Sequence, residues 1–157
     1  MKSYLKVQDK GEILVENEGV LNAIQIGNMI VLVNPSEVLA NEDELTICVK
    51  AKGKIVTDQA YTKVLSNSNV KINVRMELED SSYFPHPVLF YNNANLQMNT
   101  EIHVSGKSTI VETFILGRRG SGERFTKGKI KAVTKIYSGE EMLVYDIFRV
   151  NDEDYLD

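Results

Sequence analysis

The segment Val70–Leu78, with the sequence VKINVRMEL, decides the fold class because apolar and polar residues alternate through its whole length. A period of two places successive side chains on opposite faces of a strand, so this segment has one buried face and one wet face. The same alternation runs through Leu96–Val104, where only Thr100 interrupts the apolar face, and through Lys129–Ile136. These three segments predict long β-strands.

The rest of the chain continues this pattern. Met142–Val150 is mostly apolar on both faces, apart from Asp146 and Arg149, so we expect this strand to lie deeper than the others. Shorter candidate strands are Glu12–Val15, Leu21–Ile26, Met29–Val33, Leu45–Lys50 and Lys54–Thr57. Helical apolar stripes with capping residues are missing, and turn-forming residues separate the strands at hairpin-like spacing. The sequence predicts an all-β fold with little helix, in which antiparallel strands form packed or wrapped sheets, as a sandwich or stacked β-layers without a long-period repeat.

Length and composition predict one domain over residues 1–157, with a net charge of −4 that argues against nucleic-acid binding. No apolar run is long enough to cross a membrane, and Met1–Gln25 mixes charges without the apolar core of a signal peptide. We therefore expect a cytoplasmic protein with neither a membrane nor a nucleic-acid partner. The single cysteine, Cys48, excludes an intramolecular disulfide and a cysteine-based zinc site, and is expected to be a small buried residue.

Charge is distributed unevenly near the end of the chain. Seven basic residues and one acid, Glu123, lie between Arg118 and Lys135, whereas the segment Glu140–Asp157 carries acids against the single Arg149. Two interpretations are open. The segments pair with one another across a hairpin or are simply solvated, or they offer an electrostatic docking face to a partner.

The segment Gly117–Phe125, GRRGSGERF, follows the strand-like run Thr109–Leu116. Its three glycines permit backbone angles that other residues avoid, and its arginines suit carboxylates or phosphates. It is not a phosphate-binding loop of the Walker type, which requires Gly-Lys-Ser/Thr at the start of a helix. It is either a solvated connection or a shaped turn. For a shaped turn we expect positive φ at one or more glycines, and carboxylates, Glu123 nearest in sequence, holding Arg118 and Arg119.

The pattern Gly-Arg-x-x-x-Gly-Glu-x-Phe in this segment resembles the signature of the UreD (UreH) family of urease accessory proteins. Upstream, Ile55–Val64 is similar to the family's Thr-Thr-Gln-x-Ala-Thr-Lys-(Ile/Val)-Tyr strand, with Lys63 at the lysine. Leu78–Ala94 is similar to its Leu-x-x-Leu-Pro-x-Pro-x-Ile-x-Phe-x-x-Ala segment, and Tyr145-Asp146 stands where the family tends to have an aspartate before a leucine-rich strand. The four segments follow the family's order.

The chain also departs from the family pattern. Val33–Asp43 lacks the two glycines of the family's Gly-Gly-Asp turn, and Leu65 replaces the tyrosine of the Lys-(Ile/Val)-Tyr strand. Family members also run on for a substantial C-terminal region.

The resemblance implies a UreD-like β fold and a non-enzymatic urease maturation factor, a metallochaperone that helps to hand nickel to urease. The implied partners are the urease structural subunits, UreF and the GTPase UreG, with a dimer as a further assembly. Nickel would be a transient cargo, and no organic cofactor is implied. The family-motif and partner-binding residues are Gly117, Arg118, Arg119, Gly122, Glu123, Phe125 and Lys63. The alternative is an all-β module that binds protein or carbohydrate and keeps the fold without the urease role.

Three side chains are candidates for a transient nickel route. Glu112 and Asp146 lie inside apolar runs, where a carboxylate is costly unless it is paired or reaches water. Either an arginine holds each of them, or they line a polar channel of the kind that the resemblance implies; for Asp146 we favour the channel and for Glu112 the arginine. His86, between two prolines, could present an imidazole to nickel or simply face solvent in a turn. Neither these groups nor His103 forms a catalytic triad or zinc motif, so no enzyme is predicted.

Overall fold

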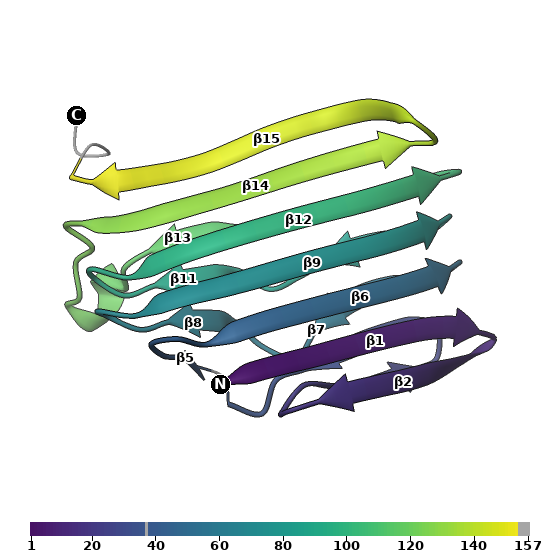
Figure 1. Ribbon diagram of the computed structural model, residues 1–157, viewed down its shortest axis with the longest axis horizontal. Helices are drawn as coiled ribbons and strands as arrows, with labels where there is room; N and C mark the ends of the chain where they lie inside the picture. The colour runs from purple at the N-terminus through teal and green to yellow at the C-terminus, as the bar shows by residue number, and fades with distance from the viewer. Residues whose placement is uncertain (37, 154–157) are drawn as a thin grey trace.

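The computed structural model describes residues 1–36 and 38–153. The largest of three sheets contains, in spatial order, β15 (Glu141–Asp152), β14 (Gly128–Ser138), β12 (Asn95–Ser105), β9 (Asn69–Glu79), β6 (Glu44–Lys52), β1 (Lys2–Lys10) and β2 (Glu12–Glu18). The second contains β10 (Ser82–Phe84), β7 (Ile55–Asp58), β4 (Met29–Val33) and β3 (Asn22–Ile26). The third contains β13 (Phe114–Leu116), β11 (Val88–Phe90), β8 (Thr62–Val64) and β5 (Val38–Leu39). Figure 1 shows the short strands behind the long sheet.

The chain winds as a parallel β-solenoid. Each coil supplies one strand to each sheet, first β4, β5 and β6, then β7, β8 and β9, then β10, β11 and β12, and successive coils pair in parallel. Leu45 lies beside Ile72 and Ile72 beside Met98, offsets of 27 and 26 residues. The all-β prediction with little helix is therefore confirmed, since the one helical element among the described residues is a 3₁₀ turn at Arg119–Ser121.

The prediction of purely antiparallel strands is wrong. Antiparallel pairing is found in β1–β2, β3–β4 and β14–β15, whereas the coils themselves pair in parallel. A period of two reports that one face of a strand is buried, and it carries no information about the direction of the neighbouring strand. The prediction of a fold without a long-period repeat was also wrong, because the coils repeat every 26 to 27 residues. The repeat is one of backbone position, and the residues that stack share little beyond being apolar.

Stacked apolar side chains fill the interior. One ladder of neighbours on successive coils is Ile30, Val56 and Tyr83, and another is Leu39, Val64 and Phe90. All six side chains are buried, so each coil covers the apolar face of the next. This stacking is the main source of stability, because one coil cannot bury its own apolar face.

Four-residue corners connect the third sheet to the long sheet in the first three coils, at residues 40–43, 65–68 and 91–94. Each corner holds one residue with positive φ, Glu42, Asn67 and Asn93 in turn. In the last coil the same corner spans residues 117–127. The segment singled out by its glycines and arginines is therefore an insertion into an otherwise short corner.

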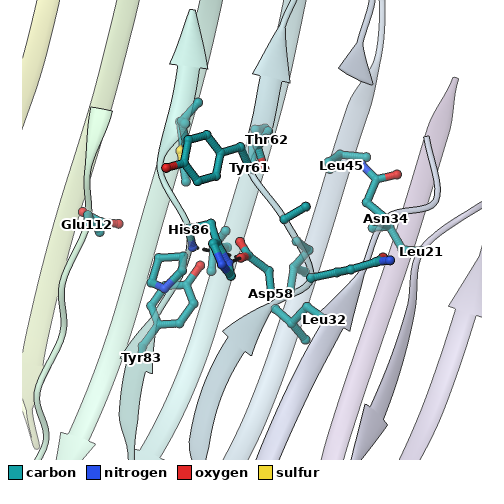
Figure 2. Close-up of a pocket in the computed structure, with 18 of the residues that line it drawn as sticks. Leu21, Leu32, Asn34, Leu45, Asp58, Tyr61, Thr62, Tyr83, His86 and Glu112 are labelled. Atoms are coloured by element: carbon teal, nitrogen blue, oxygen red, sulfur yellow. Dashed lines mark hydrogen bonds and ion pairs between the residues drawn. The ribbon is translucent and has the colours of Figure 1, made fainter. Parts of the chain in front are cut away.

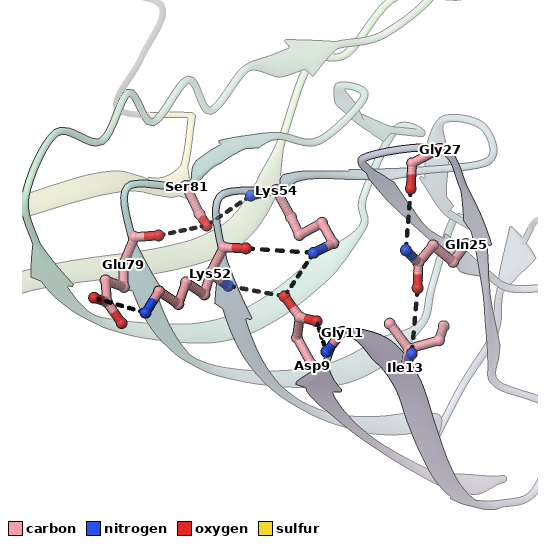
Figure 3. Close-up of polar contacts among 9 residues, drawn as sticks. All are labelled: Asp9, Gly11, Ile13, Gln25, Gly27, Lys52, Lys54, Glu79 and Ser81. Atoms are coloured by element: carbon pink, nitrogen blue, oxygen red, sulfur yellow. Dashed lines mark hydrogen bonds and ion pairs between the residues drawn. The ribbon is translucent and has the colours of Figure 1, made fainter.

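A polar clamp fixes the first hairpin to the coils (Figure 3). Asp9 in β1 accepts hydrogen bonds from the backbone N–H groups of Gly11 and Lys52 and pairs with the Lys54 ammonium at 3.1 Å. Its side chain is only 3% exposed. Burial by itself raises the pKa of Asp9, but these donors outweigh it and hold the pKa below its usual value. The sequence-based strands did not include β1, although Leu5 and Val7 alternate there with polar residues.

β15 is the outer edge of the long sheet, beyond the last coil (Figure 1). Met142, Leu143, Val144, Tyr145 and Ile147 are exposed, so the prediction that this strand lies deepest is wrong. An apolar run indicates a buried strand only when both faces are covered, and no later strand covers β15 among the described residues.

The register of the hairpin β14–β15 tests whether the charged segments pair internally. Lys131 lies opposite Arg149 and Lys135 opposite Tyr145, so the basic strand does not pair with acids across the hairpin. Internal pairing is therefore wrong for this part of the chain. The outer face of the hairpin is basic and remains available to a partner.

Candidate functional site

A cavity of about 80 Å³ lies inside the solenoid. Most of its lining is apolar and comes from the interior faces of the long strands, including Leu5, Ile72 and Met98. Figure 2 shows polar side chains around it. They include the titratable groups Asp58, Tyr83, His86 and Glu112, and others such as Asn34, Tyr61 and Thr62. Ionisable groups that are wholly or partly covered in an apolar cavity are expensive to maintain, so they mark the candidate functional site.

Asp58 and His86 form a pair on the wall of this cavity. Asp58 ends β7, and His86 lies in the proline-flanked connection between β10 and β11. Asp58 Oδ1 lies 2.6 Å from His86 Nδ1 and also accepts the His86 backbone N–H at 2.9 Å. Burial raises the pKa of Asp58, although the His86 contacts oppose this shift. His86 is thus held by a carboxylate, but its side chain remains 43% exposed, as expected of a turn histidine.

Glu112 lies in the connection before β13, and its carboxylate points to the long sheet. Thr134 Oγ1 donates a hydrogen bond to Glu112 Oε2 at 2.7 Å, whereas Glu112 Oε1 has no partner among the described residues. Burial, and the nearby charge of Asp146, raise the pKa of Glu112 against the effect of the Thr134 and Thr100 hydroxyls. The preferred interpretation, an arginine anchor for Glu112, is wrong. A threonine hydroxyl takes that place.

A row of polar residues leads from the interior to the open edge. Thr100, Thr134 and Asp146 are successive neighbours across β12, β14 and β15, and the row ends inward at the apolar Val74 of β9. Thr100 and Thr134 are buried, and the Thr100 hydroxyl makes no well-formed hydrogen bond among the described residues, although it lies near enough to Glu112 to lower the pKa of that carboxyl. Thr100 was the one residue that interrupted the apolar alternation, and this position in the sequence was the signal of a polar interior.

Asp146 ends this row on the interior face of β15. It is exposed, so the expectation that it has restricted access to solvent is wrong. The cause is the position of β15, one strand beyond the last coil. Asp146 nevertheless acts electrostatically on Glu112, so the two carboxylates share one end of the polar row.

Tyr83 links the two carboxylate regions. Its side chain is buried, and burial together with the charges of Asp58 and Glu112 raises its pKa. The hydroxyl therefore stays protonated and lies in the field of both groups. The sequence analysis missed Tyr83 and Asp58 as site residues, because a tyrosine in a short apolar strand and an aspartate at a strand end are ordinary there.

The inserted corner is a shaped turn. Gly117 and Gly122 have φ of +74° and +77°, as expected for glycines in such a turn. Arg118 and Glu123 form a two-way backbone bridge, and Arg118 Nε lies 3.2 Å from Glu123 Oε2. The Arg118 guanidinium also lies over the Tyr91 ring, 4.8 Å from its centroid. The predicted carboxylate partner of Arg118 is therefore confirmed.

Phe125 is the apolar anchor of this turn. It is buried, and a Cβ on Gly117 or Gly128 would come within 2.8 Å or 2.6 Å of its atoms. Both glycines therefore make room for Phe125, which fixes the turn on the coil. Arg119 is exposed, and no carboxylate in the described part of the chain holds it, so that half of the prediction is wrong.

The remaining predicted residues lie elsewhere. Lys63 is in β8, beside Leu89 of β11 in the third sheet, and is half-buried. Cys48 is also only half-buried, so the expected buried cysteine is not found. His103 pairs with Glu101 at 3.0 Å and stacks on Tyr137, on the outer face of the long sheet.

Metal chelation by three side chains is not found. Within residues 1–36 and 38–153, no three His, Cys, Asp or Glu side chains group closely enough to hold an ion. The structure instead offers one contacting pair, Asp58 with His86, and two carboxylates, Glu112 and Asp146, whose charges interact. Such pairs suit brief contact with a divalent ion better than tight retention.

These features define a parallel β-solenoid with a partly polar interior and a shaped turn at one corner. Residues 23–157 match the family model described as UreD urease accessory protein, so the chain belongs to the UreD family and the resemblance is confirmed. A relative named "Urease accessory protein UreD", from Bacillus cereus (strain ATCC 10987 / NRS 248), is 28% identical over 108 residues. That alignment covers 61% of this chain and 38% of the relative, so the chain spans well under half of the relative's length. No helix in the described residues is long and apolar enough to span a membrane.

Proposed function

We propose that this protein is a non-enzymatic scaffold for urease maturation, which binds apo-urease together with UreF and UreG in the cytoplasm and assists nickel delivery. Membership of the UreD family supports a role in urease maturation. The observation that carries the nickel role is the polar row through an otherwise apolar interior.

The polar groups of the cavity wall and of this row have a chemistry that suits a cargo ion. Carboxylates and neutral imidazole are ligands that nickel accepts, and hydroxyls can orient its water. Asp58 with His86 would receive the ion at the cavity wall, and Glu112 with Asp146 would pass it toward the edge formed by β15. With two protein ligands at each stage, the ion remains exchangeable and can be released to urease.

The inserted corner is the proposed contact with protein partners. Its charged pair, Arg118 and Glu123, sits on a turn fixed by buried Phe125. Arg119 projects from the same turn and is exposed. A rigid turn with an exposed guanidinium is suited to binding a carboxylate on another protein. Lys63, the other family-motif residue, is proposed as part of this contact.

A pull-down with the tagged chain tests the scaffold role. The urease structural subunits should be retained, alone or with UreF and UreG, and Arg119→Ala should reduce the retained amount. Lys107→Ala, which removes an exposed charge from a different corner, is the matched control and should bind normally. No retention of urease by the unmodified chain, in any combination of accessory proteins, would overturn the proposal.

A further inference from the structure

The outer face of the long sheet is divided into two halves that differ in charge. Toward the C-terminal ends of β6 and β9 its acids and bases are matched, since Lys50 pairs with Glu77 at 3.7 Å and Lys52 with Glu79 at 3.6 Å. Toward the N-terminal ends of β9, β12 and β14 the outward side chains are mainly basic, with Glu101 as the acid among them. The cations of this basic half are Lys71, Arg75, Lys129, Lys131, Lys135 and Arg149.

Two cations of the basic half oppose one another directly. Lys131 lies opposite Arg149 in the antiparallel pair β14–β15, and both side chains are exposed. Neither forms an ion pair within residues 1–36 and 38–153. Lys71 lies in the same row across the sheet, separated from Lys131 by Gln97. Like charges opposed on neighbouring strands destabilise a sheet, so an anion placed on this row would remove an electrostatic cost.

A shallow hollow of about 290 Å³ lies beside this row on the long sheet. Its polar lining includes Asn73, Arg75, Asn99, Glu101 and Lys135. Asparagine side chains donate hydrogen bonds to carboxylates, and a guanidinium can hold a carboxylate with two parallel N–H groups. Two cations and two amides around a single acid therefore suit the entry of an acidic side chain.

We propose that the basic half of the outer face docks a protein partner through a surface rich in Asp and Glu side chains. The chain has a net charge of −4, so a long polyanion such as a nucleic acid is repelled by the rest of the molecule. An acidic protein surface of limited extent meets only the cations.

The position of the basic half makes this docking independent of the nickel route and of the inserted corner. The polar row that includes Thr134 points to the opposite face of the sheet, so a docked partner leaves the edge at β15 open. The outer face also runs along the solenoid axis. Coils stacked on either end of the solenoid would lengthen this face without covering it.

Fluorescence anisotropy with a labelled oligo-glutamate peptide tests the docking. The wild-type chain should bind the peptide, and binding should weaken as salt screens the charges. Lys71→Gln combined with Lys131→Gln should weaken binding several-fold. Lys50→Gln combined with Lys52→Gln removes the same charge from the matched half and should bind normally. Lys50 lies six residues along β6 from Glu44, the neighbour of Lys71. This separation of roughly 20 Å exceeds the screening length of about 8 Å at physiological salt.

Carbodiimide coupling of the peptide to lysine side chains, followed by mass spectrometry, locates the contact. Coupling should be concentrated at Lys71, Lys129 and Lys131 and should be weak at Lys50 and Lys52. Far-UV circular dichroism confirms that each variant is folded. Three results would overturn the proposal: no binding of the peptide, equal weakening by the two double variants, or coupling concentrated in the matched half. Tighter binding of a single-stranded DNA of equal charge would also overturn it, because the partner would then be a nucleic acid.

Discussion

Thr134 Oγ1 donates a hydrogen bond to Glu112 Oε2 at 2.7 Å and so joins the connection before β13 to the interior face of β14. This contact explains how a carboxylate persists in an apolar run without an arginine. The hydroxyl satisfies one oxygen, and the other stays unpaired among the described residues. Glu112 is therefore a partly buried acid with one unpaired oxygen, and its ionisation can be measured.

The first prediction concerns pH and stability. Burial raises the pKa of Glu112, so the folded protein keeps its proton at pH values where the unfolded chain has lost it. Stability should therefore fall as pH rises above the ordinary glutamate value of 4.5. The raised pKa of Asp58 acts in the same direction. Glu112→Gln should reduce this fall, measured as the melting temperature from pH 4 to pH 8, and an unchanged pH profile would contradict the assignment.

The second prediction concerns the inserted corner. Gly117→Ala forces a Cβ into the left-handed region and against the Phe125 backbone nitrogen, so it should lower the free energy of unfolding by at least about 1–2 kcal/mol. Gly120→Ala is the matched control, because Gly120 lacks positive φ and has open space around it. Its effect should stay within about 0.5 kcal/mol. Equal losses in urea denaturation would show that the turn does not depend on this geometry.

The third prediction separates function from stability. Arg118→Ala or Glu123→Ala breaks a partly exposed pair, so the loss of unfolding free energy should be below about 1 kcal/mol. Urease activation in cells should nevertheless decrease, since the turn positions charges for a partner. Lys127→Ala, in the same connection, is the control. Normal urease activity in both test variants would remove this turn from the mechanism.

The fourth prediction concerns the clamp at Asp9. Asp9→Ala leaves the Lys54 ammonium, whose side chain is 15% exposed, and two backbone N–H groups without this acceptor, so about 3 kcal/mol of unfolding free energy should be lost. Lys52→Ala removes an exposed pair with Glu79 and should cost less than about 1 kcal/mol. Because the pKa of Asp9 is lowered, its contribution is present above the ordinary aspartate value of 3.8 and is lost as pH falls below it. If Asp9→Ala lost less than about 1 kcal/mol of unfolding free energy relative to the wild-type protein, this result would contradict the clamp.

The sequence predicted the strands better than their arrangement. Alternation predicted the ends of β9, β12 and β14 to within a residue or two, because a strand with one buried face alternates apolar and polar residue types. It could not give the direction of pairing, since Leu45 beside Ile72 looks the same in parallel and antiparallel sheets. The sequence also could not predict that β15 lies at the edge, because an apolar strand is consistent both with a deep position and with an uncovered edge.

Only part of the candidate site could be predicted from the sequence. The glycines and arginines of the inserted corner indicated a shaped turn, and the pair Arg118–Glu123 was close enough in sequence to be predicted. Asp58 with His86, and Glu112 with Thr134, are contacts between residues 28 and 22 positions apart. Such contacts follow from the coil-to-coil offset, which the residue pattern did not reveal.

The nickel content of urease purified from cells is the most direct test of the polar route. The urease genes would be expressed with wild-type protein, Glu112→Gln, Asp146→Asn, or the control Glu101→Gln, whose carboxylate lies beside His103 on the outer face of the long sheet. Equal accessory-protein levels and equal retention of urease in a pull-down would be required of all four. The account predicts less nickel per urease active site with Glu112→Gln and Asp146→Asn, and a normal amount with Glu101→Gln. Full nickel occupancy with both interior variants would contradict it.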